Sequence, residues 1–115
     1  MSKTTDDQLD DKKLPAYNIH PGEDLQDKLE ARNMSQKQLA DLIGLKPSML
    51  NEIIKGKRSI TPSIAIKLEA GLSNSAEYWL KGQQMYDLYK VRQENQETIA
   101  NIREKRVRYW RDEEG

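Results

Sequence analysis

Residues 36–55 read QKQLADLIGLKPSMLNEIIK and hold three residues whose types and spacing are informative. Ala40 offers a small side chain where a second helix can cross the first. Gly44 follows four positions later, and glycine tolerates the positive φ of a tight turn. Leu50 comes six positions after the glycine and can point back into the crossing. This spacing predicts two short helices that pack at a steep angle across a tight turn, the geometry of a helix-turn-helix.

Signals for the starts of helices occur within and on both sides of this stretch. Pro21 suits the first turn of a helix, and Ser35 with Gln38 forms a capping box. Residues 61–62 repeat the pattern of a cap followed by proline, and Ser75 can cap a further helix. The apolar residues recur at helical spacing, and in residues 39–43 the expected apolar side consists of Leu39, Ala40, Leu42 and Ile43.

The expected fold is therefore all-α, with five short helices around one core. We divide the chain into three parts. Residues 1–18 are polar and acidic and are expected to form a flexible N-terminal arm. Residues 19–92 are expected to form the helix-turn-helix domain, and residues 93–115 are expected to form a C-terminal helical tail.

Composition narrows the classes of function. The 115 residues are 36% hydrophobic and 33% charged, which suits one small domain with solvated ends. Cysteine is absent and the single histidine is His20, so a metal site or a histidine-based catalytic triad is not expected. His20 is expected to cap or pack at the start of the first helix. No apolar run approaches the roughly 18 residues of a membrane span, and no signal peptide is visible. We expect a cytoplasmic protein without a cofactor, a membrane or a small-molecule ligand.

The charges are unevenly distributed although the formal net charge is zero. Between Gly44 and Arg58, Glu52 is the only acid. The basic residues of the same stretch are Lys46, Lys55, Lys57 and Arg58. A local basic cluster beside an exposed helix is typical of DNA binding, whereas each lysine alone would be an ordinary surface charge.

The candidates for reading bases lie at the start and along the outer side of the second helix. In this docking mode the N-terminal residues of that helix reach base edges. Asn51 is the strongest candidate because a carboxamide can pair bidentately with adenine. The Ser48 hydroxyl can donate to or accept from a base edge of either DNA strand. Pro47 can pack on a thymine methyl group. Lys46 can reach guanine or a phosphate, and the sequence does not decide between them.

Glu52 has two interpretations that stay open. Its carboxylate can accept from cytosine, or it can pair on the helix surface with Lys55 or Lys57. The phosphate contacts are expected just beyond this helix and at the start of the preceding one, where backbone N–H groups are free. The residues assigned to phosphates are Gln36, Lys55, Lys57 and Arg58.

The C-terminal third holds aromatic residues in two groups. We expect Trp79 in the core, whereas Met85, Tyr86 and Tyr89 lie further along a helix that can outrun the core, and we assign them to a dimer interface. Residues 103–111 read REKRVRYWR and keep three interpretations. They can grip nucleic acid, insert their aromatic side chains into a partner protein, or form a solvated helix end.

Several short motifs together resemble one family, the HigA-type antitoxins of the lambda-repressor-like (Xre) class of helix-turn-helix proteins. The resemblance covers about residues 19–92 and implies a five-helix lambda-repressor-like domain. The N-terminal arm and the C-terminal helical extension lie outside the part that resembles the family. The motifs are HPGE at 20–23, SQKQLA at 35–40, LNEIIKGKR at 50–58, EYWL at 77–80 and YDLY at 86–89.

The resemblance implies a type II toxin–antitoxin pair, in which the antitoxin binds an mRNA-cleaving toxin and represses its own operon. It also implies a homodimer whose recognition helices meet successive major grooves of palindromic operator DNA. The family commonly has a Ser or Thr cap where Lys46 stands and a polar residue where Pro47 stands. The operator sequence of the family is therefore not assigned to this chain. The helix that begins here is expected to start with Pro47 rather than with a side-chain cap. The resemblance assigns base recognition to Lys46, Ser48 and Asn51. It assigns phosphate contacts to Gln36, Lys55 and Lys57.

Three other functions compete with the antitoxin interpretation. The chain can be a stand-alone or phage-type transcriptional regulator without a toxin, or a protein-interaction module that has lost DNA binding. An enzyme has the least in its favour, because the paired acids at 6–7 and 113–114 lie in tails where no scaffold fixes their geometry.

Overall fold

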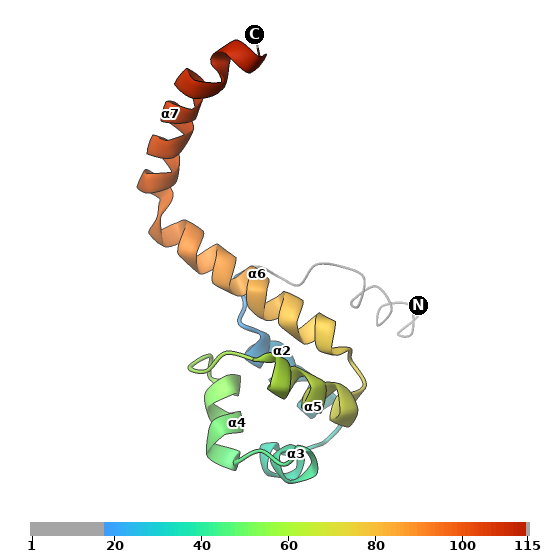
Figure 1. Cartoon of the computed structure of the whole chain (residues 1–115). Coiled ribbons are helices and arrows are strands. Elements are labelled where there is room, and N and C mark those ends of the chain that lie inside the picture. Colours follow the sequence, from blue (N-terminus) through green and yellow to red (C-terminus); the bar gives the residue numbers. More distant parts are fainter. Residues whose placement is uncertain (1–17, 115) are drawn as a thin grey trace, which may run out of the picture.

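The computed structural model describes residues 18–114. Five of the helices in this part pack into one body, and the sixth, α7, extends from the end of α6 away from it (Figure 1). The predicted all-α fold with a C-terminal helical extension is confirmed, whereas the predicted arm lies outside the described residues except for Asn18. The helices are α2 (Pro21–Ala31), α3 (Gln36–Ile43), α4 (Pro47–Ile54), α5 (Pro62–Leu72), α6 (Ala76–Glu94) and α7 (Gln96–Glu114).

The helices start at the capping signals that the sequence predicts. The Ser35 hydroxyl accepts from the backbone N–H of Gln38 at 3.0 Å, and the backbone N–H of Ser35 donates to the Gln38 side chain at 2.8 Å. The capping box of α3 is therefore complete. The Thr61 and Ser75 hydroxyls accept backbone N–H groups at the starts of α5 and α6. Each such cap stabilises its helix by about 1 kcal/mol.

The turn between α3 and α4 has the predicted geometry. Gly44 has a φ of 76°, which is in the left-handed region. Its backbone N–H donates to the carbonyl of Ala40 at 2.9 Å and closes α3. Ala40 and Leu50 are completely buried at the crossing of the two helices. The three residues that define the motif therefore take the roles that their spacing predicts.

One core holds α2 to α6 together. Trp79 of α6 is completely buried in it, as expected from the sequence. Each fully buried leucine or isoleucine contributes roughly 1.5–3 kcal/mol of transfer free energy. Besides Trp79, the completely buried large side chains are Leu25, Leu29, Leu39, Leu50, Ile53 and Leu68.

The expectation that Leu42 lies on the buried side of α3 is wrong, because Leu42 is 59% exposed. Leu39 is completely buried and Ile43 is partly buried, whereas Leu42 approaches α5 with the end of its side chain, its Cδ2 atom 3.6 Å from a Cβ atom built on Gly71. The contact of α3 with α5 is close: a Cβ atom on Gly71 would lie 2.7 Å from Ile43 Cγ2. Leu42 instead borders a small apolar groove between α3 and α5, with Lys67 and Ala70 on its other side.

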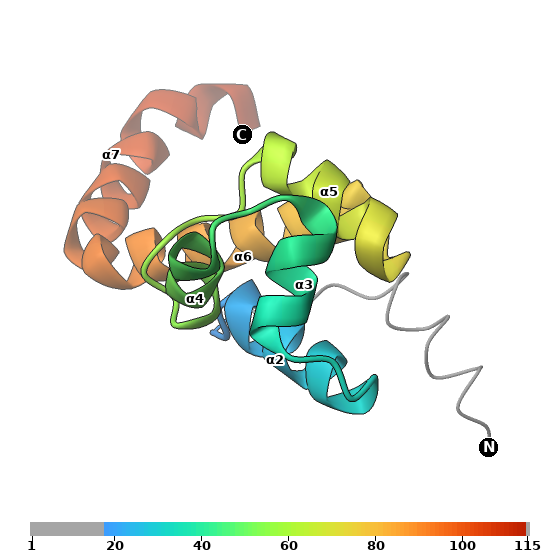
Figure 2. The same ribbon diagram turned by 90° about the horizontal axis from the view of Figure 1, so that it is seen from below.

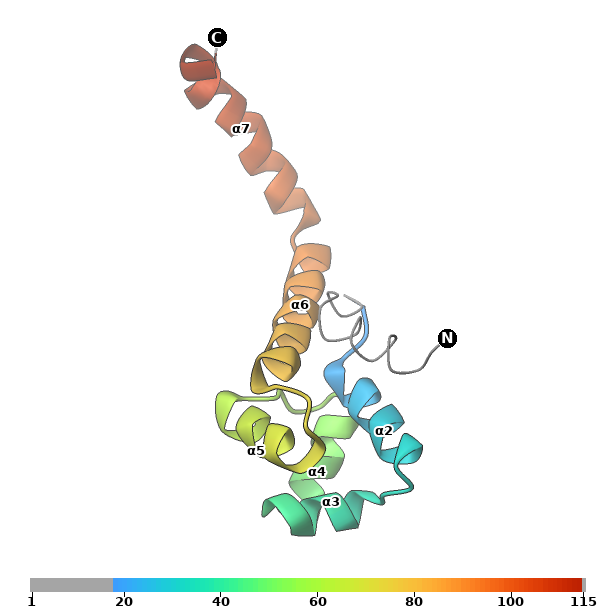
Figure 3. The ribbon, with the colours of Figure 1, turned by 90° about the vertical axis from the view of Figure 1, so that its right-hand side faces the viewer.

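Within the described residues, α7 contacts the end of α6 and extends away from the other helices (Figure 1). The Asn95 side chain donates to the carbonyl of Val91 at 2.7 Å, and the chain bends there before α7 begins. Every residue from Ala100 to Trp110 is exposed. In Figure 3, α7 lies at the opposite end of the molecule from α3 and α4. Within residues 18–114, no helix combines the length and the apolar character that a bilayer crossing requires.

Candidate nucleic-acid interface

Helix α4 is held by its inner side and presents its outer side to solvent. Leu50 and Ile53 are completely buried beneath it. Lys46 stands at the N-cap without a side-chain cap, and Pro47 occupies the first turn, as predicted. Viewed from below, α3 and α4 lie on the near side of the body and α7 lies behind it (Figure 2). The outer side of α4 is therefore open in the described part of the chain.

The predicted base-reading residues lie together on this outer side. Lys46, Pro47 and Ser48 are exposed at the start of α4, and Asn51 and Glu52 follow as half-buried residues one turn later. Their hydrogen-bonding groups are diverse, with an ammonium, a hydroxyl, a carboxamide and a carboxylate within two turns. Such a surface can distinguish base edges in a major groove.

The Asn51 carboxamide belongs to a hydrogen-bonded series of side chains that crosses three helices. Its Nδ2 group donates to Gln36 Oε1 of α3 at 3.1 Å. Gln36 Nε2 in turn donates to Gln26 Oε1 of α2 at 3.4 Å, and Gln26 Nε2 donates to Glu30 Oε2 at 3.0 Å. We call these four residues the amide relay. Gln26 and Glu30 were not predicted from the sequence, and their four-residue spacing on a helix was the available signal.

Gln36 thus has a side chain engaged within the protein. From the sequence, Gln36 is expected to contact a phosphate through its backbone N–H and a base or a phosphate through its amide. In the structure this amide is hydrogen-bonded to Asn51 and Gln26. The backbone N–H lies in the first turn of α3, where N–H groups lack partners within the helix and are available to an anion.

Glu52 and Arg58 form an ion pair at the edge of the same surface. Arg58 Nη2 and Nε lie 2.8 and 2.9 Å from Glu52 Oε1. The expected surface pairing of Glu52 with Lys55 or Lys57 is wrong, because its partner is Arg58. The chain turns back after α4, so that Arg58 reaches Glu52 across the loop. Both side chains are nearly half exposed, so the pair contributes at most about 1 kcal/mol to stability.

Lys55 and Lys57, which are expected from the sequence to contact phosphates, lie at the end of α4 and just beyond it. Both are exposed at the C-terminal end of α4, and neither forms an ion pair with another residue of the described chain. Gly56 between them has a φ of 78°, which turns the chain sharply. The backbone N–H of Lys57 donates to the carbonyl of Glu52 at 2.8 Å and ties this loop to α4. The two ammonium groups therefore flank a fixed turn.

His20 caps α2 and links it to α6, as expected for a residue at the first helix start. Its Nδ1 atom accepts from the backbone N–H of Gly22 at 2.8 Å, and its ring meets the Tyr86 ring edge-on at 5.0 Å. Burial lowers the pKa of His20, because desolvation outweighs the opposing effect of Asp87 and Glu23. His20 is therefore a structural group. Within the described residues, no set of three acidic, histidine or cysteine side chains is placed to hold a metal ion.

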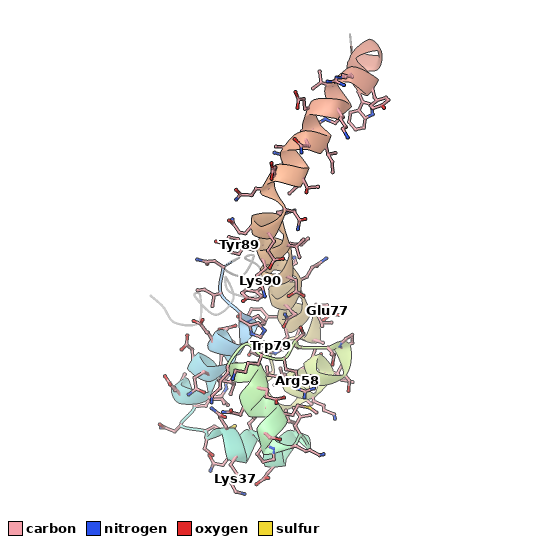
Figure 4. The ribbon with its side chains drawn as sticks, turned by 90° about the vertical axis from the view of Figure 1, so that its left-hand side faces the viewer. Lys37, Arg58, Glu77, Trp79, Tyr89 and Lys90 are labelled. Atoms are coloured by element: carbon pink, nitrogen blue, oxygen red, sulfur yellow. The ribbon has the colours of Figure 1, made fainter. Side chains whose placement is uncertain are left out.

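The residues assigned to the dimer interface differ in their exposure. Tyr86 and Met85 are half-buried, with Tyr86 packed on His20, whereas Tyr89 is 36% exposed on α6 (Figure 4). A neighbouring face of α6 carries an open apolar groove of about 360 Å³, which was not predicted from the sequence. The spacing of its residues along α6 was the signal that could have found it. Its apolar lining consists of Ile60, Leu80, Leu88 and Val91.

Comparison with known proteins agrees with this geometry. A family model described as Helix-turn-helix matches residues 25–79. The Virulence-associated protein I of Dichelobacter nodosus is 37% identical over 84 residues, covering 72% of this chain and 76% of the relative. Antitoxin HigA-1 of Vibrio cholerae is 36% identical over 75 residues, covering 65% of this chain and 70% of the antitoxin. A solved structure of the Pseudomonas aeruginosa antitoxin HigA with the higBA promoter has a TM-score of 0.68 at 31% identity, covering 71% of this chain and 90% of that one.

The packed α3–α4 pair and the open polar side of α4 define a helix-turn-helix protein of the DNA-binding type. The chain belongs to this helix-turn-helix family, in the Xre-like group that includes the HigA antitoxins. The resemblance found in the sequence is thereby confirmed. The family is one of DNA-binding regulators and antitoxins rather than of enzymes.

Proposed function

We propose that this chain is the antitoxin of a type II toxin–antitoxin pair. It binds operator DNA as a homodimer, represses its own operon and neutralises an mRNA-cleaving toxin. The observation that carries the DNA-binding part is the open outer side of α4, which presents Asn51 between Ser48 and the two exposed ammonium groups of Lys55 and Lys57. The solved structure of the related Pseudomonas aeruginosa antitoxin HigA with the higBA promoter supports the same assignment.

In the proposed complex the N-terminal half of α4 enters the major groove. Asn51 pairs with an adenine edge, Ser48 hydrogen-bonds a neighbouring base, and Lys46 and Pro47 contact guanine or phosphate and a thymine methyl group. One N–H of Asn51 is used by Gln36, which leaves its second N–H and its Oδ1 for the base.

The phosphate contacts in this proposal surround the reading residues. Lys55 and Lys57 bind the backbone beyond the C-terminal end of α4, and the N–H of Gln36 binds it at the start of α3. Arg58 holds Glu52 through Nε and Nη2, so its Nη1 group is left to donate to a phosphate. Glu52 would accept from cytosine only when this ion pair opens, which makes it the weaker of the proposed readers.

A dimer is proposed because one such domain makes few base contacts. Two copies on half-sites one helical turn apart, about 34–36 Å, increase both affinity and specificity. The proposed interface lies on α6 and includes Met85, Tyr86 and Tyr89. Of these, Tyr89 is the most exposed. The apolar groove lined by Leu88 and Val91 lies on the same helix. Burying these apolar side chains between two copies would favour association.

The position of α7 favours one of the interpretations of residues 103–111. Because α7 lies at the opposite end of the molecule from α4, it does not reach a duplex that α4 of the same chain reads (Figure 3). This placement supports contact with a partner protein, and a toxin bound there would leave the outer side of α4 free.

Two measurements test the proposal. The first is binding of the full chain to the DNA directly upstream of its own reading frame, at several salt concentrations, where affinity should fall steeply as salt rises. The second is co-purification with the product of the neighbouring reading frame. Operator binding without a co-purifying toxin would identify a stand-alone regulator instead. Toxin binding without DNA binding would identify a protein-interaction module.

A further inference from the structure

The amide relay has one consistent direction of donation. In each of its three links a side-chain NH₂ group donates and an oxygen accepts, in the order Asn51 to Gln36, Gln36 to Gln26 and Gln26 to Glu30. A carboxamide has a donor end and an acceptor end of nearly the same shape, so turning it over exchanges the two. The direction of the relay therefore decides which end each amide presents.

Glu30 sets this direction because it is the only member that is not an amide. An ionised carboxylate accepts hydrogen bonds and donates none. Gln26 must therefore present its NH₂ group to Glu30, which leaves its oxygen for Gln36. Gln36 then presents its own oxygen to Asn51. At the end of the relay Asn51 presents Oδ1 and one remaining N–H to the outside.

We propose that Glu30 and Gln26 are positioning residues for base recognition, which act through Gln36 to fix the orientation of the Asn51 carboxamide. This inference rests on the proposed reading role of Asn51. An adenine edge offers one acceptor and one donor at fixed positions, and an Asn held in one orientation matches it. An Asn that turns freely also presents its NH₂ group to the acceptors of guanine. The relay therefore gives the site its discrimination between the two purines.

The test compares variants of the full chain on a duplex of the DNA upstream of its reading frame. A second duplex carries guanine in place of the adenine that Asn51 contacts. For each variant, the measured quantity is its affinity for the first duplex divided by its affinity for the second. Glu30→Gln should lower this ratio roughly two- to tenfold, the range that one hydrogen bond supplies. Combining Glu30→Gln with Gln26→Glu should restore it, because a carboxylate at position 26 again only accepts from Gln36.

Asp41→Asn is the matched control. Asp41 lies in an exposed i,i+4 pair with Lys37 on α3, at 3.4 Å, so the variant removes one acidic charge without touching the relay. Its affinity ratio should equal that of the unmodified chain. The rescued double variant retains the formal charge of the natural pair, so a general electrostatic effect cannot explain its recovery.

A second readout does not depend on DNA. The side-chain NH₂ signals of Asn51 in an NMR spectrum of the free protein should shift in Glu30→Gln and return in the double variant. Unchanged signals and an unchanged ratio in Glu30→Gln, with Asn51→Ala still weakening binding to the upstream duplex, would overturn the relay and leave the proposed function standing. A silent Asn51→Ala would overturn the reading role itself, and the relay's part in specificity with it.

Discussion

Gly22 in the first turn of α2 lies directly against the backbone of Ile53 at the end of α4. A Cβ atom built on Gly22 would stand 2.0 Å from the Ile53 carbonyl oxygen and 2.8 Å from that of Ile54. No side chain fits between these atoms. The recognition helix is therefore seated on α2 by a contact that only glycine permits, one residue after the buried proline that starts α2.

Gly22→Ala should consequently destabilise the fold or displace α4. Because backbone atoms must move, we expect a loss of about 1–3 kcal/mol or more in the free energy of unfolding, measured by urea denaturation. Gly71→Ala is the control and should destabilise the fold less. Its Cβ atom would meet the Cγ2 atom of Ile43 at 2.7 Å, and a side chain can adjust more easily than backbone. Equal stability of the two variants would contradict this account of how α4 is held.

The two lysines beyond α4 should determine the salt dependence of DNA binding. Lys55→Gln and Lys57→Gln should each flatten the slope of log affinity against log salt by roughly one unit. Lys105→Gln on α7 removes the same charge at the far end of the molecule and should leave the slope unchanged. A comparable change in all three variants would mean that the lysines act through net charge alone.

The buried histidine should make stability depend on pH. The pKa of His20 is lowered from 6.5 in the folded chain, so below that pH the unfolded chain binds more protons. The contribution of His20 is complete above pH 6.5 and is lost as the pH falls toward its folded-state pKa. His20→Asn retains a capping acceptor that does not titrate. The melting temperature of this variant should fall less than that of the natural chain between about pH 7.5 and 5.5. Parallel declines would rule out His20 as the cause.

Removal of α7 should leave the DNA-binding body intact. Because residues from Ala100 to Trp110 are exposed, ending the chain at Asn95 should change stability by only about 0.5 kcal/mol. A longer truncation that also removes Tyr86 takes away the ring that packs on His20 and should destabilise the body clearly. Thermal unfolding of both truncated chains distinguishes them, and a large loss from the shorter truncation would show that α7 packs on the body.

The predictable part of this molecule is the part encoded locally. Ala40, Gly44 and Leu50 lie within eleven residues, and each obeys a steric rule of its own, so the turn between α3 and α4 follows from the sequence. The caps at Ser35 and Ser75 are equally local, because the partner N–H lies three residues away.

The other features of the site depend on packing between helices and could not be predicted from local sequence patterns. The amide relay joins Gln26 to Asn51 across three helices, and its links form only once these helices are placed. Glu52 lies within reach of three basic residues in the sequence, and the direction of the chain after Gly56 selects Arg58. The exposure of Leu42 likewise depends on how α3 lies against α5, where Leu39 is completely buried and Leu42 stays at the surface.

The most direct test of the central claim, that the outer side of α4 reads DNA, is the affinity of Asn51→Ala for the upstream duplex and for a scrambled duplex at the same salt concentration. We predict a loss of about 1–3 kcal/mol on the upstream duplex and little change on the scrambled one. Unchanged affinity for both duplexes, with the natural chain preferring the upstream one, would contradict the claim.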